Sequence, residues 1–224
     1  MKTRPALVLV TLLPLLGCDV EVPPFPAGQG QAKTAISYPG GPYGVTKTSV
    51  ITNFELAGFP APAASADPTA LVPITLADFY NPTGDGVYPA GSPYGEGQPK
   101  PKALLIDIGA VWCTPCQFEA KTILPKLYEQ YKPLGAEFLF DLADGPKGGI
   151  AATPTELVSW VKKYKSTFPC ALDPERKLGA SFNTDSFPVN ILVDTRTMQI
   201  VDVVAGVPDE GGAFFQNLDA LLKP

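Results

Sequence analysis

The 224-residue chain contains no histidine. Because histidine is the commonest general base and a common ligand of zinc, copper and haem iron, its absence excludes a Cys–His catalytic pair and argues against haem or another metal centre. Positive charge is also scarce, since 17 Lys and Arg stand against 22 Asp and Glu and give a net charge of −5. Without a basic surface to attract phosphates, nucleic acid is excluded as a partner. The chemistry must come from cysteine, carboxylate or backbone groups.

No apolar run is long enough for a comfortable membrane span, and the longest, ALVLVTLLPLL (6–16), is interrupted by Pro14. This run follows a short basic segment, as in a signal peptide, and ends in LLGC (15–18). The LLGC motif resembles the bacterial lipobox, whose cysteine is lipidated and becomes the mature N-terminus. We therefore expect residues 1–17 to be a lipoprotein signal peptide and a lipidated Cys18 to anchor the protein to a membrane, on the periplasmic side of a bacterial cell envelope. The alternative is an ordinary signal peptide that is cleaved elsewhere.

Proline and glycine, with 26 and 21 residues, gather in two stretches that lack apolar periodicity. The first follows the signal peptide, and we interpret residues 18–48 as a tether that holds a folded domain clear of the membrane. The second, residues 81–101, is long for a loop inside a compact domain. We interpret it as an insertion, because Asp85 and Glu96 within it lack the spacing of calcium ligands. Residues 49–224 remain for one globular domain.

Strands alternate with helices from residue 103 onward, and a hairpin and a helix end the chain. This order predicts an α/β fold with a mixed central sheet flanked by helices. The first helix should be kinked or broken at Pro125, and Thr153 with Glu156 predicts a capping box at the start of the second. The expected strands are 49–56, 103–111, 136–143, 168–172, 188–194 and 199–206, the expected helices are 116–131, 153–164 and 211–222, and 74–80 is a short strand or a helical turn.

Two of the four cysteines, Cys113 and Cys116, form a C-x-x-C pair between a buried strand and a helix. A structural zinc site needs four ligands and haem attachment needs a histidine after the second cysteine, so both are excluded. A purely structural disulfide and a redox-active one remain. The helix N-terminus stabilises a thiolate by about 0.3–1 kcal/mol, which favours Cys113 as the reactive thiol and Cys116 as the less exposed one. Cys170 has no activating neighbour in sequence, and we expect it to be a buried core thiol.

The stretch LLIDIGAVWCTPC (104–116) resembles the active-site strand and turn of the thioredoxin superfamily, and in particular its membrane-tethered TlpA/ResA-type reductases. The resemblance extends over about residues 49–222 and implies a thioredoxin-like fold with a redox-active Cys113–Cys116 disulfide. FPVNILVD (187–194) resembles the segment that carries the family's cis-proline. A client-binding groove at this site is implied by the same resemblance; its residues would be Trp112, Thr114, Pro115, Phe187 and Pro188.

The resemblance also implies roles for two acids. Asp107 matches the family's buried aspartate, which accepts the proton of the second cysteine, here Cys116. The alternative is a structural acid, but an unsatisfied carboxylate in an apolar strand costs about 1–3 kcal/mol, and a function would account for its presence. Glu119 matches a glutamate of the TlpA/ResA-type proteins or is a solvated residue of the first helical turn, and both interpretations stay open.

Other residues have structural alternatives or depart from the family pattern. Trp112 could simply pack against the loop, and Pro188 could be an ordinary trans proline, since only about 5–6% of X–Pro bonds are cis. Lys121 stands where the family has a proline, and Phe187 stands where it has Thr, Val or Ile. Client preference therefore does not carry over from the family.

The resemblance implies an exported thiol:disulfide oxidoreductase that needs no cofactor and acts on client proteins with disulfides or thiols. Thr-Pro between the cysteines carries no charge that would stabilise the thiolate, which favours a reductase. By analogy, electrons would come from a membrane thiol donor, and the role would be like cytochrome c maturation. The alternatives are a thiol peroxidase of the peroxiredoxin-related branch, which should have a T-x-x-C motif and an arginine, and a non-catalytic surface lipoprotein that acts as a binding module. A copper chaperone of the Sco branch is disfavoured by the missing histidine.

Overall fold

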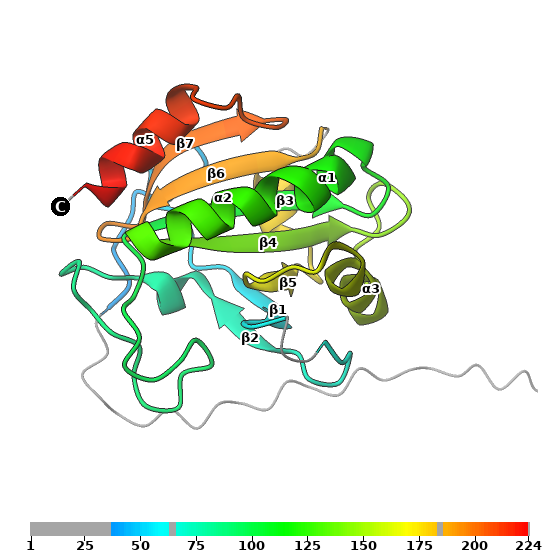
Figure 1. Ribbon diagram of the computed structural model, residues 1–224, viewed down its shortest axis with the longest axis horizontal. Helices are drawn as coiled ribbons and strands as arrows, with labels where there is room; N and C mark the ends of the chain where they lie inside the picture. The colour runs from blue at the N-terminus through cyan, green and yellow to red at the C-terminus, as the bar shows by residue number, and fades with distance from the viewer. Residues whose placement is uncertain (1–36, 63–65, 183–185, 224) are drawn as a thin grey trace, which may run out of the picture. The chain divides into compact units, whose positions relative to one another are not determined.

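A computed structural model describes residues 37–62, 66–182 and 186–223 (Figure 1). The predicted signal peptide, Cys18 and the tether as far as residue 36 lie outside these residues, so they stay predictions. Across the described ranges, we find no helix with the length and apolar character needed to cross a membrane.

One mixed sheet forms the centre of the domain, as the sequence predicts. Within the described residues it has the strand order β2-β1-β5-β4-β3-β6-β7. The three central strands β3, β4 and β5 run parallel, whereas β1, β6 and β7 pair antiparallel to their neighbours. The strands are β1 (Glu55–Phe59), β2 (Val72–Thr75), β3 (Ala103–Ala110), β4 (Ala136–Asp144), β5 (Cys170–Leu172), β6 (Val189–Asp194) and β7 (Gln199–Ala205).

Helices cover both faces of the sheet, which explains why β3 and β4 are buried along their whole length. Phe138 and Phe140 of β4 point to one face, where they pack against Tyr128 of α2 at 5.4 Å and Trp160 of α3 at 5.0 Å. On the other face, Ala143 contacts α4. The helices are α1 (Thr114–Phe118), α2 (Leu124–Tyr131), α3 (Pro154–Tyr164), α4 (Lys177–Ser181) and α5 (Ala213–Leu222).

The first long helix is irregular just before Pro125, where the sequence predicts a kink or break. A π-helical segment, Glu119–Ile123, joins α1 to α2, and Figure 1 shows the whole run crossing in front of β3 and β4. Proline has no amide hydrogen and its ring clashes with the preceding turn, so a regular α-helical bond cannot form there. The amide of Leu124 instead donates to the carbonyl of Glu119, five residues earlier. The helix is therefore distorted but not ended.

The N-terminal boundaries differ from the sequence prediction. The first strand is Glu55–Phe59 and not residues 49–56, and the preceding segment runs beside the start of β7 without forming a regular strand. The predicted tether also extends too far, because the Tyr38 hydroxyl donates to the Ile51 carbonyl over 2.8 Å and the Thr48 amide to the Ile200 carbonyl over 2.8 Å. These long-range bonds place residues 38–48 against the domain.

Two further segments take the forms that the sequence leaves open. Residues 74–80 contain both alternatives, the end of β2 followed by a 3₁₀ turn at Leu76–Phe79. The insertion 81–101 is an ordered surface loop whose Tyr88 and Tyr94 rings stack at 5.0 Å, with Tyr94 also against Phe79 at 5.1 Å.

The predicted capping box of α3 is confirmed by reciprocal bonds between Thr153 and Glu156.

Candidate active site

The C-x-x-C pair lies where β3 ends and α1 begins. Cys113 occupies the N-cap position with extended backbone angles, and its sulfur accepts a hydrogen bond from the Cys116 amide over 3.1 Å. The two sulfurs are bonded at 2.16 Å, and the Cα atoms are 5.3 Å apart. Thr114 and Pro115 form the exposed first turn, where proline is tolerated because that amide has no partner within the helix. The strand–turn–helix geometry therefore aims the free amides of α1 at Cys113.

Both cysteines are buried in this oxidised form. Cys113 is 2% exposed and Cys116 is fully buried, so the predicted order of exposure holds but the difference is small. The Trp112 ring, 43% exposed, packs edge-on against the buried Phe187 ring at 5.7 Å. Phe187 precedes Pro188, and the peptide bond between them is cis. Segments far apart in sequence thus form an aromatic rim, Trp112 and Phe187, beside the disulfide.

Asp107 is buried under α1. Gly109, on the same face of β3, has so little space that a Cβ there would lie 2.9 Å from the Phe140 ring and 3.4 Å from the Cys116 Cβ. Asp107 is 1% exposed, and among the described residues neither of its carboxylate oxygens has a hydrogen-bond partner. Burial, together with the nearby carboxylate of Glu119, raises the pKa of Asp107 well above its usual range.

Glu119 is not a solvated helix residue. It is 1% exposed at the start of the π-helical segment, and burial raises its pKa to about 7. The side-chain amide of Asn190 in β6 donates to Glu119 Oε1 over 3.1 Å, and this bond limits the rise in the Glu119 pKa because it favours the ionised carboxylate. Asp107 and Glu119 are close enough to influence each other's titration. The structure therefore gathers two carboxyl groups with raised pKa values on the α1 side of the sheet.

Asn190 is a site residue that the sequence analysis missed. It pairs directly with Asp107 across β3 and β6, so its side chain lies on the same face as Asp107. A second bond from its amide reaches the Gly206 carbonyl over 3.3 Å. A polar residue in the otherwise apolar strand after Pro188 is the signal that could have identified it.

Two other buried groups lie near but outside this cluster. Asp141 of β4, also missed, pairs with Ile108 and therefore points to the opposite face of the sheet from Asp107. Burial raises the pKa of Asp141 well above its usual range, and the carboxylate of Asp173 raises it further. Cys170 is a buried core thiol, as predicted, and burial raises its pKa to about 12, so it carries almost no thiolate at neutral pH.

Similar proteins have names that refer to thiol–disulfide chemistry. The chain is 27% identical to thiol-disulfide oxidoreductase ResA of Bacillus cereus over 109 residues, 48% of this chain and 57% of that protein. It is 22% identical to ResA of Bacillus subtilis over 125 residues, 56% of this chain and 64% of that protein. The chain thus spans little more than half the length of these relatives. No family model matches it.

The solved structures that resemble this one share its fold. A putative thiol:disulfide interchange protein DsbE from Chlorobium tepidum superimposes with a TM-score of 0.55 at 19% identity, covering 80% of this chain and 99% of that one. At these identities the likeness concerns the fold alone.

Proposed function

We propose that this chain, which belongs to the thioredoxin superfamily and is related to its ResA-type members, is a thiol:disulfide oxidoreductase that exchanges its Cys113–Cys116 pair with the disulfides of client proteins. The observation that carries the proposal is the position of this pair at the amide end of α1, above two buried carboxyl groups. An N-terminal amide cluster stabilises a thiolate, and a carboxyl with a raised pKa can accept a proton at neutral pH. A purely structural disulfide needs neither feature.

The exchange begins with the reduced protein. The Cys113 thiolate attacks one sulfur of a client disulfide, the client S–S bond breaks, and the second client sulfur leaves as a thiolate that takes a proton from water. A mixed disulfide then joins Cys113 to the client. Cys116 loses its proton and attacks the Cys113 sulfur, so the mixed disulfide breaks and the client sulfur leaves as a thiolate that takes a proton from water. Two electrons pass to the client, and the Cys113–Cys116 disulfide forms.

Asp107 and Glu119 are the proposed acceptors of the Cys116 proton. Asp107 lies on the β3 face that α1 covers, and its raised pKa means that it can take up a proton that an ordinary aspartate would not hold. Glu119, with a pKa of about 7, is close to half-ionised at neutral pH and can both accept and release a proton. Trp112, Thr114, Pro115, Phe187 and Pro188 are proposed to contact the client.

The proposed direction of electron flow is toward the client. Thr114 and Pro115 place no cation beside Cys113, so the reduced form gains less stability than in strong oxidants of the superfamily. We further propose that the protein is exported and held by a lipidated Cys18 on the periplasmic side of the cell envelope, with a membrane thiol donor as the source of electrons. A role like that in cytochrome c maturation rests on analogy with family members.

Trapping of the mixed disulfide tests the exchange. Cys116→Ser should accumulate covalent adducts with a disulfide-bonded peptide, because the resolving thiol is gone, whereas Cys113→Ser should form no adduct. Mass spectrometry of the adduct identifies the attacking cysteine. Equal adduct formation by both variants would contradict the assigned roles, and no adduct with either would contradict the exchange function.

The reduction potential of the pair tests the direction. A reductase should lie near about −270 mV, as thioredoxin does, and equilibration with glutathione buffers measures this value. A potential near about −120 mV, that of the strong oxidant DsbA, would reverse the proposed flow.

A further inference from the structure

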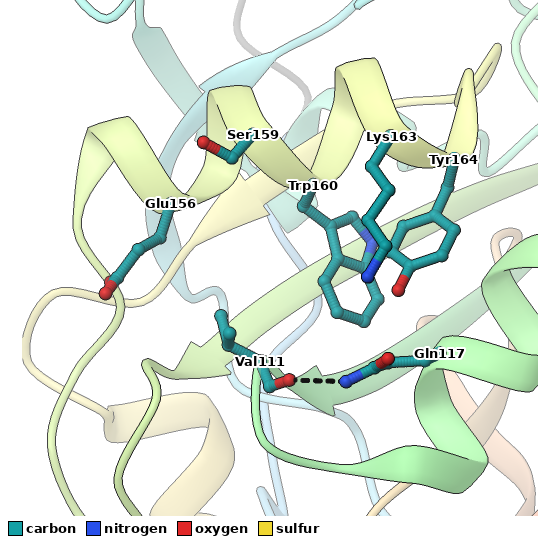
Figure 2. A pocket seen from close by; sticks show the side chains of 7 residues that line it. All are labelled: Val111, Gln117, Glu156, Ser159, Trp160, Lys163 and Tyr164. Carbon is teal, nitrogen blue, oxygen red and sulfur yellow. Dashed lines mark hydrogen bonds between the residues drawn. The ribbon is translucent and has the colours of Figure 1, made fainter.

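We propose that a pocket between α1 and α3 is a subsite for the client, and that it binds an acidic side chain close to the client's reactive cysteine. This inference rests on the proposed exchange function and adds a client preference to it. The pocket has a volume of about 230 Å³, enough for one side chain. Its lining residues are Val111, Gln117, Glu156, Ser159, Trp160, Lys163 and Tyr164 (Figure 2).

The pocket lies beside the reactive pair. One wall comes from Val111, two residues before Cys113, and from Gln117, directly after Cys116, and the Gln117 amide donates to the Val111 carbonyl over 2.8 Å. The other wall is α3. Since an extended chain advances about 3.3 Å per residue, a client side chain a few residues from the attacked cysteine can reach this wall.

Most polar groups of the pocket already have partners within the fold. The Glu156 carboxylate accepts from the Thr153 amide over 2.7 Å, and the Ser159 hydroxyl donates to the Thr155 carbonyl over 2.8 Å. The Gln117 amide nitrogen is bonded as described. Trp160, 5% exposed, gives the pocket an apolar floor. The bonded groups of Gln117, Glu156 and Ser159 therefore shape the pocket and leave recognition to the unbonded donors of the other lining residues.

Lys163 and Tyr164 each hold a donor that is not in use, and the Trp160 indole N–H also has no hydrogen-bond partner among the described residues. Tyr164 is 8% exposed, and its hydroxyl finds no hydrogen-bond partner among the described residues. The Lys163 ammonium lies over the Tyr164 ring at 4.9 Å from its centroid, and Lys163 forms no salt bridge with a described residue. Figure 2 shows both side chains extending from α3 toward Gln117.

A cation beside an unused hydroxyl donor fits an anionic acceptor. A client Asp or Glu would place its carboxylate at Lys163 and Tyr164 and its methylene groups against Trp160. The exposed Lys163 chain can swing aside to admit it. Glu156 lies at the opposite end of the pocket, seven residues or about 10 Å along the helix, and would repel an acid placed there. The charge along α3 therefore fixes the orientation of the bound side chain.

Disulfide-bonded peptides that differ only at one position test the preference. Each peptide carries Glu, Gln or Lys three residues from its own cysteine. Reduction of each peptide by the full chain is measured at low ionic strength. We expect the Glu peptide to show a KM at least about fivefold lower than the Gln peptide, with kcat little changed. Lys163→Gln should abolish the difference. Lys162→Gln removes the same charge from an exposed neighbour outside the pocket and should preserve it.

Tyr164→Phe separates recognition from folding. The variant loses a buried hydroxyl that has no partner in the described structure, so its resistance to urea should be at least that of the parent. Its preference for the Glu peptide should nevertheless weaken. A clear loss of stability with an unchanged preference would give Tyr164 a structural role and overturn its part in the subsite.

A neutral small disulfide keeps the two proposals apart. 2-Hydroxyethyl disulfide has no carboxylate for Lys163 and Tyr164 to bind, so the parent, Lys163→Gln and Tyr164→Phe should reduce it at equal rates. Reduction of every peptide with the same KM would overturn the subsite and leave the exchange function standing. A preference for the Lys peptide would overturn the subsite as well. No reduction of any disulfide would overturn both proposals.

Discussion

Asn190 of β6 donates a hydrogen bond to Glu119 of the π-helical segment over 3.1 Å, joining two parts of the chain that are 71 residues apart. This bond favours the ionised carboxylate and therefore limits the rise in the Glu119 pKa that burial causes. It also places an amide beside the two acids under α1. The bond thereby connects β6 of the sheet to the helical run that carries the cysteines.

Asn190→Ala should raise the pKa of Glu119 above about 7, because the hydrogen bond that favours the charged form is lost. The pH midpoint of disulfide exchange should move upward by up to about one unit. A carboxyl NMR titration of Glu119 and the pH profile of peptide reduction measure the change. Asn217→Ala is a matched control, since Asn217 makes a similar bond to Asp202 away from the disulfide. An unchanged midpoint in Asn190→Ala would separate Glu119 from the exchange.

Glu119→Gln should change how stability depends on pH in the oxidised protein. Folding raises the pKa of Glu119 from 4.5 to about 7, so the folded state binds its proton more tightly and the stabilisation is full below pH 4.5. It is lost as the pH rises through about 7. Above that pH the variant should be more stable than the parent by up to about 3 kcal/mol, and the difference should shrink in acid. Urea unfolding across this range tests the prediction, and a pH-independent difference would contradict it.

Phe187→Ala should open the aromatic rim. Cys113 is 2% exposed, and Trp112 beside it packs against Phe187. Removal of the Phe187 ring frees Trp112 to move, and a small phosphine reductant should then react with the disulfide several times faster. Stopped-flow Trp fluorescence follows the reaction. Phe118→Ala removes an exposed ring of the same size from α1 and serves as the control. Equal rates for the two variants would show that the rim does not limit access.

Arg176→Gln should destabilise the domain much more than Arg196→Gln. The Arg176 guanidinium donates to the Asp144 carboxylate over 2.8 Å, and the Asp144 side chain is only 2% exposed, so loss of the cation leaves a buried charge without its counterion. We expect a cost of about 2–4 kcal/mol. Arg196 pairs with Asp194 at an exposed turn, where the cost should stay below about 1 kcal/mol. Urea unfolding of both variants at neutral pH compares them directly.

Local patterns in the sequence were enough to predict most of the architecture and the position of the cysteine pair. The apolar run of β3, the Thr153 capping box and the C-x-x-C spacing each depend on residues that are close in the chain. The burial of Asp107 followed from its place in that apolar run, and the core position of Cys170 from its lack of activating neighbours. Lipidation of Cys18 and export concern residues outside the described structure and stay predictions.

The missed features depend on contacts between distant segments. Asn190 becomes a site residue only when β6 pairs with β3 and brings its side chain to Asp107. The pairing of β1 with β5 depends on Gly58, where a Cβ would lie 2.3 Å from the Cys170 carbonyl oxygen, so only glycine allows this close approach. Nothing local to either residue specifies these partners.

The π-helical segment Glu119–Ile123 has a geometric consequence for the domain. Each residue of an α-helix advances about 100° around its axis, and a π turn contains one extra residue, so the periodicity upstream is out of phase with the periodicity downstream. The run from α1 to α2 can therefore point its cysteine turn and Tyr128 of α2 in two directions that a uniform α-helix of the same sequence would not combine. Regular α-helical winding of the same sequence would turn one end by about 100° relative to the other, whereas deleting one residue between 119 and 123 would restore regular winding and keep both ends in their present orientations.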